Sequence, residues 1–338
     1  MNISCDAIGY SELGRMLQND GMLKYFETGP QREPAYPLLI SLAMHIEGWT
    51  GIVYTKIMAA FGVVILLISQ ILVYAILRRL NVRAGICAAV LLYFGFSPAL
   101  NNTAFSLYSE IATYPFILGI VLISGRLWEA SRRDQRKSAC LSGAALGLLF
   151  AGVTLIKAVF EIIFPAYTII FLAALLLPRL KIRRQLQTAA LSIIVAIGCY
   201  YAPITAYKQL NKIHNGNFAI TNRGSWALYG NTARRMEPLT FKRFLTALVY
   251  VPGEGVCTSL FSADECRVWS FYESDTFGLG KLNELNNQGL SKTQIDTQLI
   301  KMSKEKILQN PFQYVLLMIF EGGKMFFWES TQIGFVQY

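Results

Sequence analysis

Residues 57–77 decide the fold class of this chain, and they read IMAAFGVVILLISQILVYAIL. No charged side chain interrupts these 21 residues, and two arginines, Arg78 and Arg79, follow at once. About 20 consecutive apolar residues are enough to cross the hydrocarbon core of a bilayer as a helix. The segment therefore predicts a transmembrane helix that ends at a basic loop.

Comparable apolar segments recur along the chain. They cover residues 84–98, 111–127, 139–156, 158–177 and 188–207, and a weaker one covers residues 312–328. The segment at 84–98 is short for a span, so we expect it to continue toward Phe105. The apolar run at 36–46 is too short to cross and is expected to be an interfacial helix. The sequence thus predicts an all-α polytopic membrane protein.

The composition agrees with this class. Of the 338 residues, 54% are hydrophobic and 15% are charged, whereas soluble domains carry about 25% charged residues. The net charge of +10 comes from 31 basic and 21 acidic residues, and on a soluble protein it would suggest nucleic-acid binding. Here most of the basic excess lies in short loops between apolar segments, so we expect no nucleic-acid partner.

The loops between the apolar segments alternate in charge. Three of them carry three, five and four basic residues, and two short loops on the opposite side carry one in total. The basic loops are residues 78–83, 126–137 and 179–184, and the opposite short loops are residues 99–110 and 157–161. Because short basic loops stay cytoplasmic, we expect a multi-pass protein, in bacteria of the inner membrane, whose other face meets the periplasm.

This topology divides the chain into four regions. We expect a first extracytoplasmic loop with amphipathic helices at 1–50, a transmembrane bundle at 51–207, an extracytoplasmic loop region at 208–311 and a further transmembrane helix at 312–338. Residues 1–8 lack the basic and apolar regions of a signal peptide, although the topology places them outside. We therefore expect a preceding span and further spans to belong to a longer protein, or, alternatively, the first loop to be exported together with the first span.

Two acidic residues are candidates for chemistry at the outer face. Asp6 lies in the first outer loop, before an amphipathic helix predicted at 10–19, and Glu110 opens the span at 111–127. A carboxylate at the membrane face can accept a proton from an acceptor hydroxyl, and it can also bind a divalent cation. The alternatives are an ordinary solvated residue for Asp6 and, for Glu110, a helix N-terminal acid stabilised by the macrodipole.

A basic residue lies at the same face. Lys157 and Glu161 are four residues apart where one predicted span ends and the next begins, a spacing that favours a structural ion pair. Alternatively, Lys157 binds a lipid-linked phosphate, because its compact charge on a flexible stem suits that ligand.

Several short motifs appear in a fixed order along the chain. They are Gly9-Tyr10 beside Asp6, then Arg32, Pro34-Ala35-Tyr36-Pro37-Leu38-Leu39, Ser109-Glu110 and Leu155-Ile156-Lys157, with Asn310-Pro311 and Tyr314 in the tail. This order resembles the GT-C membrane glycosyltransferases, in particular the family of protein O-mannosyltransferases and aminoarabinose transferases. The resemblance covers most of residues 1–210 and about 290–330.

The resemblance implies a GT-C-like helix bundle and a site at its outer face. Asp6 matches the family's first-loop catalytic acid and Glu110 its second-loop glutamate. Arg32 lies in the substrate-facing loop, and Lys157 occupies a basic position near the lipid phosphate. Tyr10 and Tyr36 belong to the matched motifs and are expected to bind substrate.

Two positions depart from the family pattern. Ala7 follows Asp6 where a second acid is often found, so a metal bound by paired acids is not expected from this motif. Lys157 occupies a position that is often Arg. No paired-His or CxxC spacing appears either, so we assign no metal ligand and leave a divalent cation open as a cofactor.

The long outer segment contains an aromatic stretch at 220–230. Trp226 and Tyr229 can stack on an acceptor sugar or peptide, or the stretch can be a compact loop packed on its own aromatics. Residues 291–309 predict an amphipathic helix that packs on this loop or lies at the interface. Cys257 and Cys266 are nine residues apart in the same segment, and an oxidising compartment would permit a disulfide between them.

These observations lead to one principal hypothesis. We expect a glycosyltransferase that moves a sugar from a polyprenyl-phosphate donor to an extracytoplasmic acceptor, which is a lipid, a glycan or a protein hydroxyl. The alternatives are a polytopic transporter or lipid flippase and a non-catalytic membrane scaffold.

Overall fold

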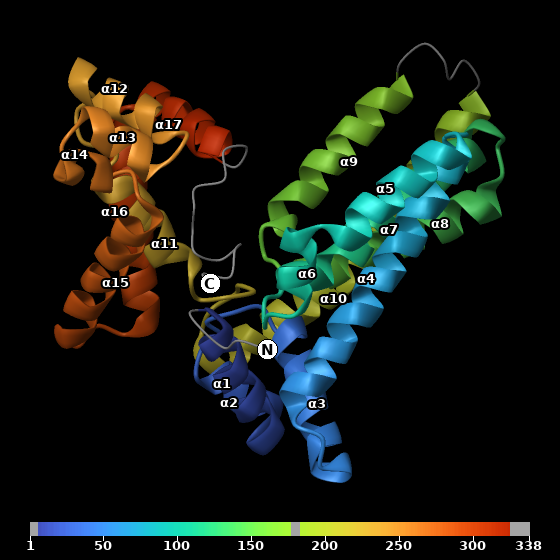
Figure 1. Ribbon diagram of the computed structural model, residues 1–338, viewed down its shortest axis with the longest axis horizontal. Coiled ribbons are helices and arrows are strands. Elements are labelled where there is room, and N and C mark those ends of the chain that lie inside the picture. Colours follow the sequence, from blue (N-terminus) through green and yellow to red (C-terminus); the bar gives the residue numbers. More distant parts are fainter. Residues whose placement is uncertain (1–5, 177–182, 325–338) are drawn as a thin grey trace. The chain divides into compact units, whose positions relative to one another are not determined.

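The computed structural model describes residues 6–176 and 183–324, and all regular elements within them are helices (Figure 1). The chain divides into two compact units, Met1–Thr221 and Asn222–Tyr338. The expected all-α architecture is therefore confirmed. Each unit has its own hydrophobic clusters and is described by itself.

The first unit contains ten helices among the described residues. They are α1 (Asp6–Asn19), α2 (Gly21–Glu27), α3 (Ala35–Thr50), α4 (Tyr54–Arg79), α5 (Ala84–Phe96), α6 (Pro98–Ala104), α7 (Glu110–Arg132), α8 (Arg136–Thr154), α9 (Phe160–Leu176) and α10 (Arg183–Asn215).

Four of these helices, α4, α7, α8 and α10, are long and apolar enough to cross a membrane. Helices α5 and α6 form a fifth candidate span that is bent by 50°. The bend follows from Pro98, because a residue before proline disfavours the helical conformation, and Ser97 is extended at φ −61° and ψ 116°. The expected continuation of the segment at 84–98 toward Phe105 is thus confirmed, with a break. These candidate spans indicate that the chain is a multi-pass membrane protein.

Two predicted spans are only partly described. Helix α9 has 17 residues and is shorter than the other candidates, and residue 177 lies outside the described residues. The weak apolar segment at 312–328 begins with α17 (Pro311–Lys324), a helix of 14 residues that is not among the candidate spans of the described chain. The remainder of that segment lies outside the described residues, so its assignment as a span stays a prediction.

Helices α8 and α10 approach each other closely through glycine. A Cβ atom on Gly143 would lie 2.2 Å from the carbonyl oxygen of Ser192, and one on Gly147 would lie 2.2 Å from that of Ala196. Both pairs are spaced by four residues along their helices, so one face of α8 lies directly against the backbone of α10. Small residues at this spacing are a common means of association between transmembrane helices, since they allow many van der Waals contacts.

The first outer loop folds into a helical layer. Helix α1 packs on α3, and a Cβ atom on Gly14 would lie 2.5 Å from Cγ2 of Ile40. Ala7, Tyr10 and Tyr36 are buried in a cluster that also includes Leu107. Because Leu107 immediately precedes α7, this cluster joins the layer to the outer end of the bundle.

The two ends of α7 differ in charge. Its 23 residues span about 33 Å at 1.5 Å per residue. At the C-terminal end, Arg79 of α4 pairs with Glu129 at 2.7 Å, and Gln185 of α10 donates a hydrogen bond to the Arg132 carbonyl. The basic loops therefore gather at one end of the bundle, and Glu110 lies at the other, as the charge pattern predicted.

The second unit contains seven helices among the described residues. They are α11 (Gly224–Ala233), α12 (Phe241–Tyr250), α13 (Glu254–Leu260), α14 (Ala263–Arg267), α15 (Phe271–Asn287), α16 (Lys292–Gln309) and α17. The aromatic stretch at 220–230, which was expected to be a loop, is mostly the helix α11. The predicted helix at 291–309 is confirmed as α16, capped by Ser291, and it packs on α11.

The predicted disulfide between Cys257 and Cys266 is present and fully buried. It lies in a cluster with Tyr250, Trp269 and Leu317, so it joins α13 and α14 at the place where α17 packs. The bond therefore belongs to the core of the second unit.

We predict that Gly147→Val disrupts the α8–α10 contact. The added side chain meets the Ala196 carbonyl, and overpacking of this kind typically costs about 1–3 kcal/mol. The measurement is thermal unfolding of the purified protein in detergent. Gly198→Ala on α10 is the matched control, because nothing lies within 4 Å of a Cβ atom there. Equal melting temperatures for Gly147→Val and wild type would contradict the close approach.

Candidate functional site

Six residues predicted to form the site come together at the end of the bundle opposite the basic loops. They are Asp6 and Tyr10 of α1, Arg32 in the loop before α3, Tyr36 of α3, Glu110 at the start of α7 and Lys157 between α8 and α9. Two ion pairs join four of them, and Tyr10 contacts Arg32 through its ring and Ser109 through its hydroxyl. The site therefore joins three separate parts of the first unit.

The first ion pair joins α1 to the loop before α3. Nη2 of Arg32 donates to Oδ1 of Asp6 at 2.6 Å. The Arg32 guanidinium also lies 5.2 Å from the centre of the Tyr10 ring, within the range of a cation–π interaction. The Arg32 side chain is 17% exposed and that of Asp6 is 53% exposed. The carboxylate is thus held by a largely enclosed cation and still faces solvent.

The structure corrects one argument about Asp6. In the sequence, a helix N-terminus explained Glu110 but not Asp6, since Asp6 was expected in a loop before a helix at 10–19. In the structure Asp6 already belongs to α1, so both carboxylates lie in the first described turn of a helix. The macrodipole stabilises both, and neither charge requires a catalytic explanation on its own.

Tyr10 joins the first ion pair to α7. Its hydroxyl lies 2.9 Å from Oγ of Ser109, the residue before Glu110. Tyr10 and Tyr36 meet edge to face at 5.2 Å between ring centres, and they are 1% and 2% exposed. Burial raises the pKa of both phenols, so both stay neutral. The two rings pack beneath the ion pairs, and the expected direct contact with substrate does not agree with their burial.

The second ion pair corrects the predicted partner of Lys157. Nζ of Lys157 donates to Oε1 of Glu110 at 2.7 Å, whereas Glu161 pairs with Lys208 of α10. A pair between Lys157 and Glu161 would need one continuous helix. However, α8 ends at Thr154 and α9 begins at Phe160, so the two residues do not share a helical face.

Lys157 keeps its charge at this position. Burial alone would lower the pKa of its ammonium group, but the neighbouring acidic groups, among them the Glu110 carboxylate, outweigh that effect, and the pKa lies above its ordinary value. A raised pKa means that the favourable interaction is fully present at neutral pH and is lost only as the pH rises through the raised value. Lys157 is therefore a permanent cation, 27% exposed, beside a half-exposed carboxylate.

Glu33 is a structural member of the site that the sequence analysis missed. Its Oε1 accepts a hydrogen bond from the backbone N–H of Ala158 at 2.8 Å, and the N–H of Ala35 donates to the Leu155 carbonyl at 3.0 Å. These bonds hold the loop before α3 against the turn that carries Lys157. No feature of the sequence near Glu33 marks this contact, because its partner lies 125 residues further along the chain.

Trp226 and Tyr229 lie outside the first unit, and their surroundings are described within the second unit alone. They belong to the second unit and are 6% and 7% exposed, in a hydrophobic cluster with Leu285, Ile295 and Leu299. Rings enclosed in this way have no free face on which a sugar can stack. The structure therefore favours a packing role, although the stretch is a helix and its rings pack on aliphatic residues of α15 and α16 rather than on its own aromatics.

The residues that the structure describes contain no group of three or more His, Cys, Asp or Glu side chains that could hold a metal ion. Asp6 and Glu110 instead use cationic side chains as their partners. The arrangement supplies two carboxylate acceptors and two cations at one end of the bundle. Such a set can take a proton from a hydroxyl and bind an anionic phosphate, because Arg and Lys carry more donors than one carboxylate uses.

No family model, no curated protein and no solved structure matches this chain.

We predict that Tyr10 and Ser109 stabilise the site as a pair. Both side chains are buried, and Ser109 makes no capping bond to α7, so its hydroxyl serves the contact with Tyr10. Tyr10→Phe and Ser109→Ala should each cost about 1–3 kcal/mol, because each leaves a buried hydroxyl without a partner. The double variant should cost less than the sum of the two. Strictly additive losses in thermal unfolding would contradict the contact.

Proposed function

We propose that this protein is a membrane glycosyltransferase that uses a polyprenyl-phosphate sugar as donor and acts at the outer face. One observation carries the proposal: two half-exposed carboxylates, each paired with a less exposed cation, lie at the end of the bundle opposite the basic loops. The residues of each pair come from distant parts of the chain, 26 and 47 residues apart. The GT-C-like motifs found in the sequence supply the same residues.

The chemistry that fits this arrangement is a direct displacement at the sugar. Asp6 or Glu110 accepts the proton of the acceptor hydroxyl, and the acceptor oxygen forms a bond to the anomeric carbon. The bond from that carbon to the phosphate oxygen breaks, and the electron pair leaves with polyprenyl phosphate. Arg32 and Lys157 stabilise the negative charge that develops on this leaving group.

The location suits such a donor. Its prenyl chain needs an apolar environment, which the candidate spans provide, and its charged phosphate needs cations at the interface. Lys157 lies in the turn between α8 and α9, where the apolar segments end. A donor phosphate at Lys157 would therefore keep its lipid chain beside the bundle and its sugar near the carboxylates.

A scaffold in which the same ion pairs merely fasten the α1–α3 layer to the bundle is the competing explanation. Exposed ion pairs contribute only about 0–1 kcal/mol to stability, whereas a general base contributes roughly 100- to 10,000-fold to rate. The two explanations therefore differ in what substitution of one carboxylate does to turnover.

We predict that Asp6→Asn and Glu110→Gln each reduce sugar transfer at least about 100-fold and leave the protein folded. The assay uses the full-length protein in membranes and measures polyprenyl phosphate released from synthetic polyprenyl-phosphate hexoses and pentoses. Glu27→Gln is the matched control, since Glu27 forms an exposed ion pair with Lys24 on α2 in the same layer. It should leave both activity and thermal stability near wild type.

Transfer by both variants within a few-fold of wild type would exclude the two carboxylates as catalytic bases. Movement of the donor across the membrane without transfer of its sugar would favour a transporter or flippase instead.

A further inference from the structure

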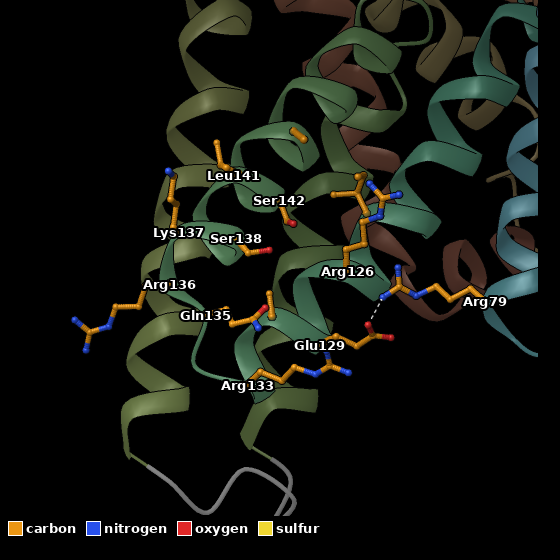
Figure 2. Close-up of a pocket in the computed structure, with 13 residues that line it drawn as sticks. Arg79, Arg126, Glu129, Arg133, Gln135, Arg136, Lys137, Ser138, Leu141 and Ser142 are labelled. Carbon is orange, nitrogen blue, oxygen red and sulfur yellow. Dashed lines mark ion pairs between the residues drawn. The ribbon is translucent and has the colours of Figure 1, made fainter.

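The basic end of the first unit contains a pocket that the proposed catalysis does not use. Its volume is about 900 Å³, within the range of small-molecule sites. It lies between the C-terminal end of α7 and the N-terminal end of α8, with Arg79 of α4 at its edge (Figure 2). The positive-inside pattern predicts that this end is cytoplasmic.

The pocket is strongly cationic. Five basic side chains and a single carboxylate, Glu129, line it, and Glu129 is paired with Arg79 at 2.7 Å. The other four cations are Arg126, Arg133, Arg136 and Lys137, and none of them forms an ion pair within the described residues. The site therefore carries unneutralised positive charge that an anionic ligand would balance.

Hydrogen-bond donors accompany this charge. In Figure 2 the hydroxyl groups of Ser138 and Ser142 on α8 point toward the side where Arg126 lies, whereas the guanidinium of Arg136 points away from them. Hydroxyl and guanidinium donors from two neighbouring helices are well suited to the several oxygens of a phosphate group. Arg126, Arg133 and the two serines are thus the most suitable ligands.

The remaining lining identifies the source of the phosphate. Apolar lining residues continue from the charged region along α7 and α8, both of which are candidate membrane spans. They are Ile123 on α7 and Leu141 and Ala145 on α8. Leu141 is 63% exposed, so an apolar surface lies directly beside the cations. A free phosphate ion would use only the charged part, whereas a phospholipid would place its head group on the cations and its acyl chains along the helices.

We propose that this pocket binds the head group of an anionic phospholipid through Arg126, Arg133, Ser138 and Ser142. The site differs from the outer site in ligand and in membrane face, because a phosphate here lies at the opposite end of α7. Basic pockets between transmembrane helices are a known way of binding such head groups. The lipid would link α7, α8 and the end of α4 where these helices leave the membrane.

The test measures lipid binding by the delipidated full-length protein in a neutral detergent. The probes are phosphatidylglycerol and phosphatidylcholine, and native mass spectrometry gives the affinity of the first bound lipid. We expect preferential binding of phosphatidylglycerol, and Arg126→Gln with Arg133→Gln should weaken it roughly fivefold for each charge removed.

The matched control removes the same charge from the same end. Arg83 and Arg132 do not line the pocket and form no ion pair in the described part of the chain. The double variant Arg83→Gln with Arg132→Gln should therefore bind phosphatidylglycerol as wild type does. Equal weakening in both double variants would mean general surface attraction and would overturn the proposal.

Two further experiments distinguish a defined head-group site from a site for a soluble anion. Ser138→Ala with Ser142→Ala leaves the net charge unchanged and should still weaken phosphatidylglycerol binding, and no effect would exclude a defined head-group site. Inorganic phosphate at millimolar concentration should not displace the lipid, and full displacement would show that the ligand is a soluble anion. Thermal unfolding in neutral detergent establishes that each variant is folded.

Discussion

Charged groups cannot remain in the middle of an apolar span, and this constraint organises the first unit. Helix α7 carries Glu110 at one end and Arg132 at the other, about 33 Å away at 1.5 Å per residue, with Glu129 about one turn before Arg132. Each end then gathers partners of opposite charge from other helices: Lys157 at the outer end and Arg79 at the basic end. The bundle between them depends on close contact of apolar and small residues, above all between α8 and α10.

The outer end differs from an ordinary set of surface ion pairs in how its parts are connected. Arg32 contacts both Asp6 and the Tyr10 ring, and Tyr10 reaches Ser109 beside Glu110. The buried phenol therefore links two ion pairs that are distant in sequence. This arrangement holds carboxylates in fixed positions while leaving about half of each side chain exposed, and the proposed function makes use of that combination.

The sequence predicted the apolar helices well, because the bilayer requires long uncharged segments and basic loops that alternate with outer ones. It also predicted that Asp6, Arg32, Glu110 and Lys157 lie at one face. It did not predict which of them pair. The choice of Glu110 for Lys157 depends on the packing of α7 beside the turn that follows α8, a contact between residues 47 positions apart in the sequence.

The contact of Glu33 and the burial of Trp226 and Tyr229 were also not predicted, because both depend on segments that are distant in the sequence. Glu33 contacts the backbone of a segment 125 residues away, and such a contact has no local signal. Trp226 and Tyr229 appeared available for a ligand because aromatic residues near glycine are common in binding loops. The apolar face of α16 covers them instead. The sequence offered packing of this helix on the stretch as one alternative, but it did not predict that the contacts enclose both rings.

The spacing of Asp6 and Tyr10, four residues apart on α1, also determines how the outer layer can open. Helix α1 cannot separate Asp6 from Arg32 as a rigid body without also withdrawing Tyr10 from its buried position and breaking its bond to Ser109. The ion pair, the burial of Tyr10 and its hydrogen bond are lost together, so the opening of this layer is cooperative. In hydrogen exchange, the amides of α1 that face α3 would then exchange as a group at one rate, as a local unfolding unit does.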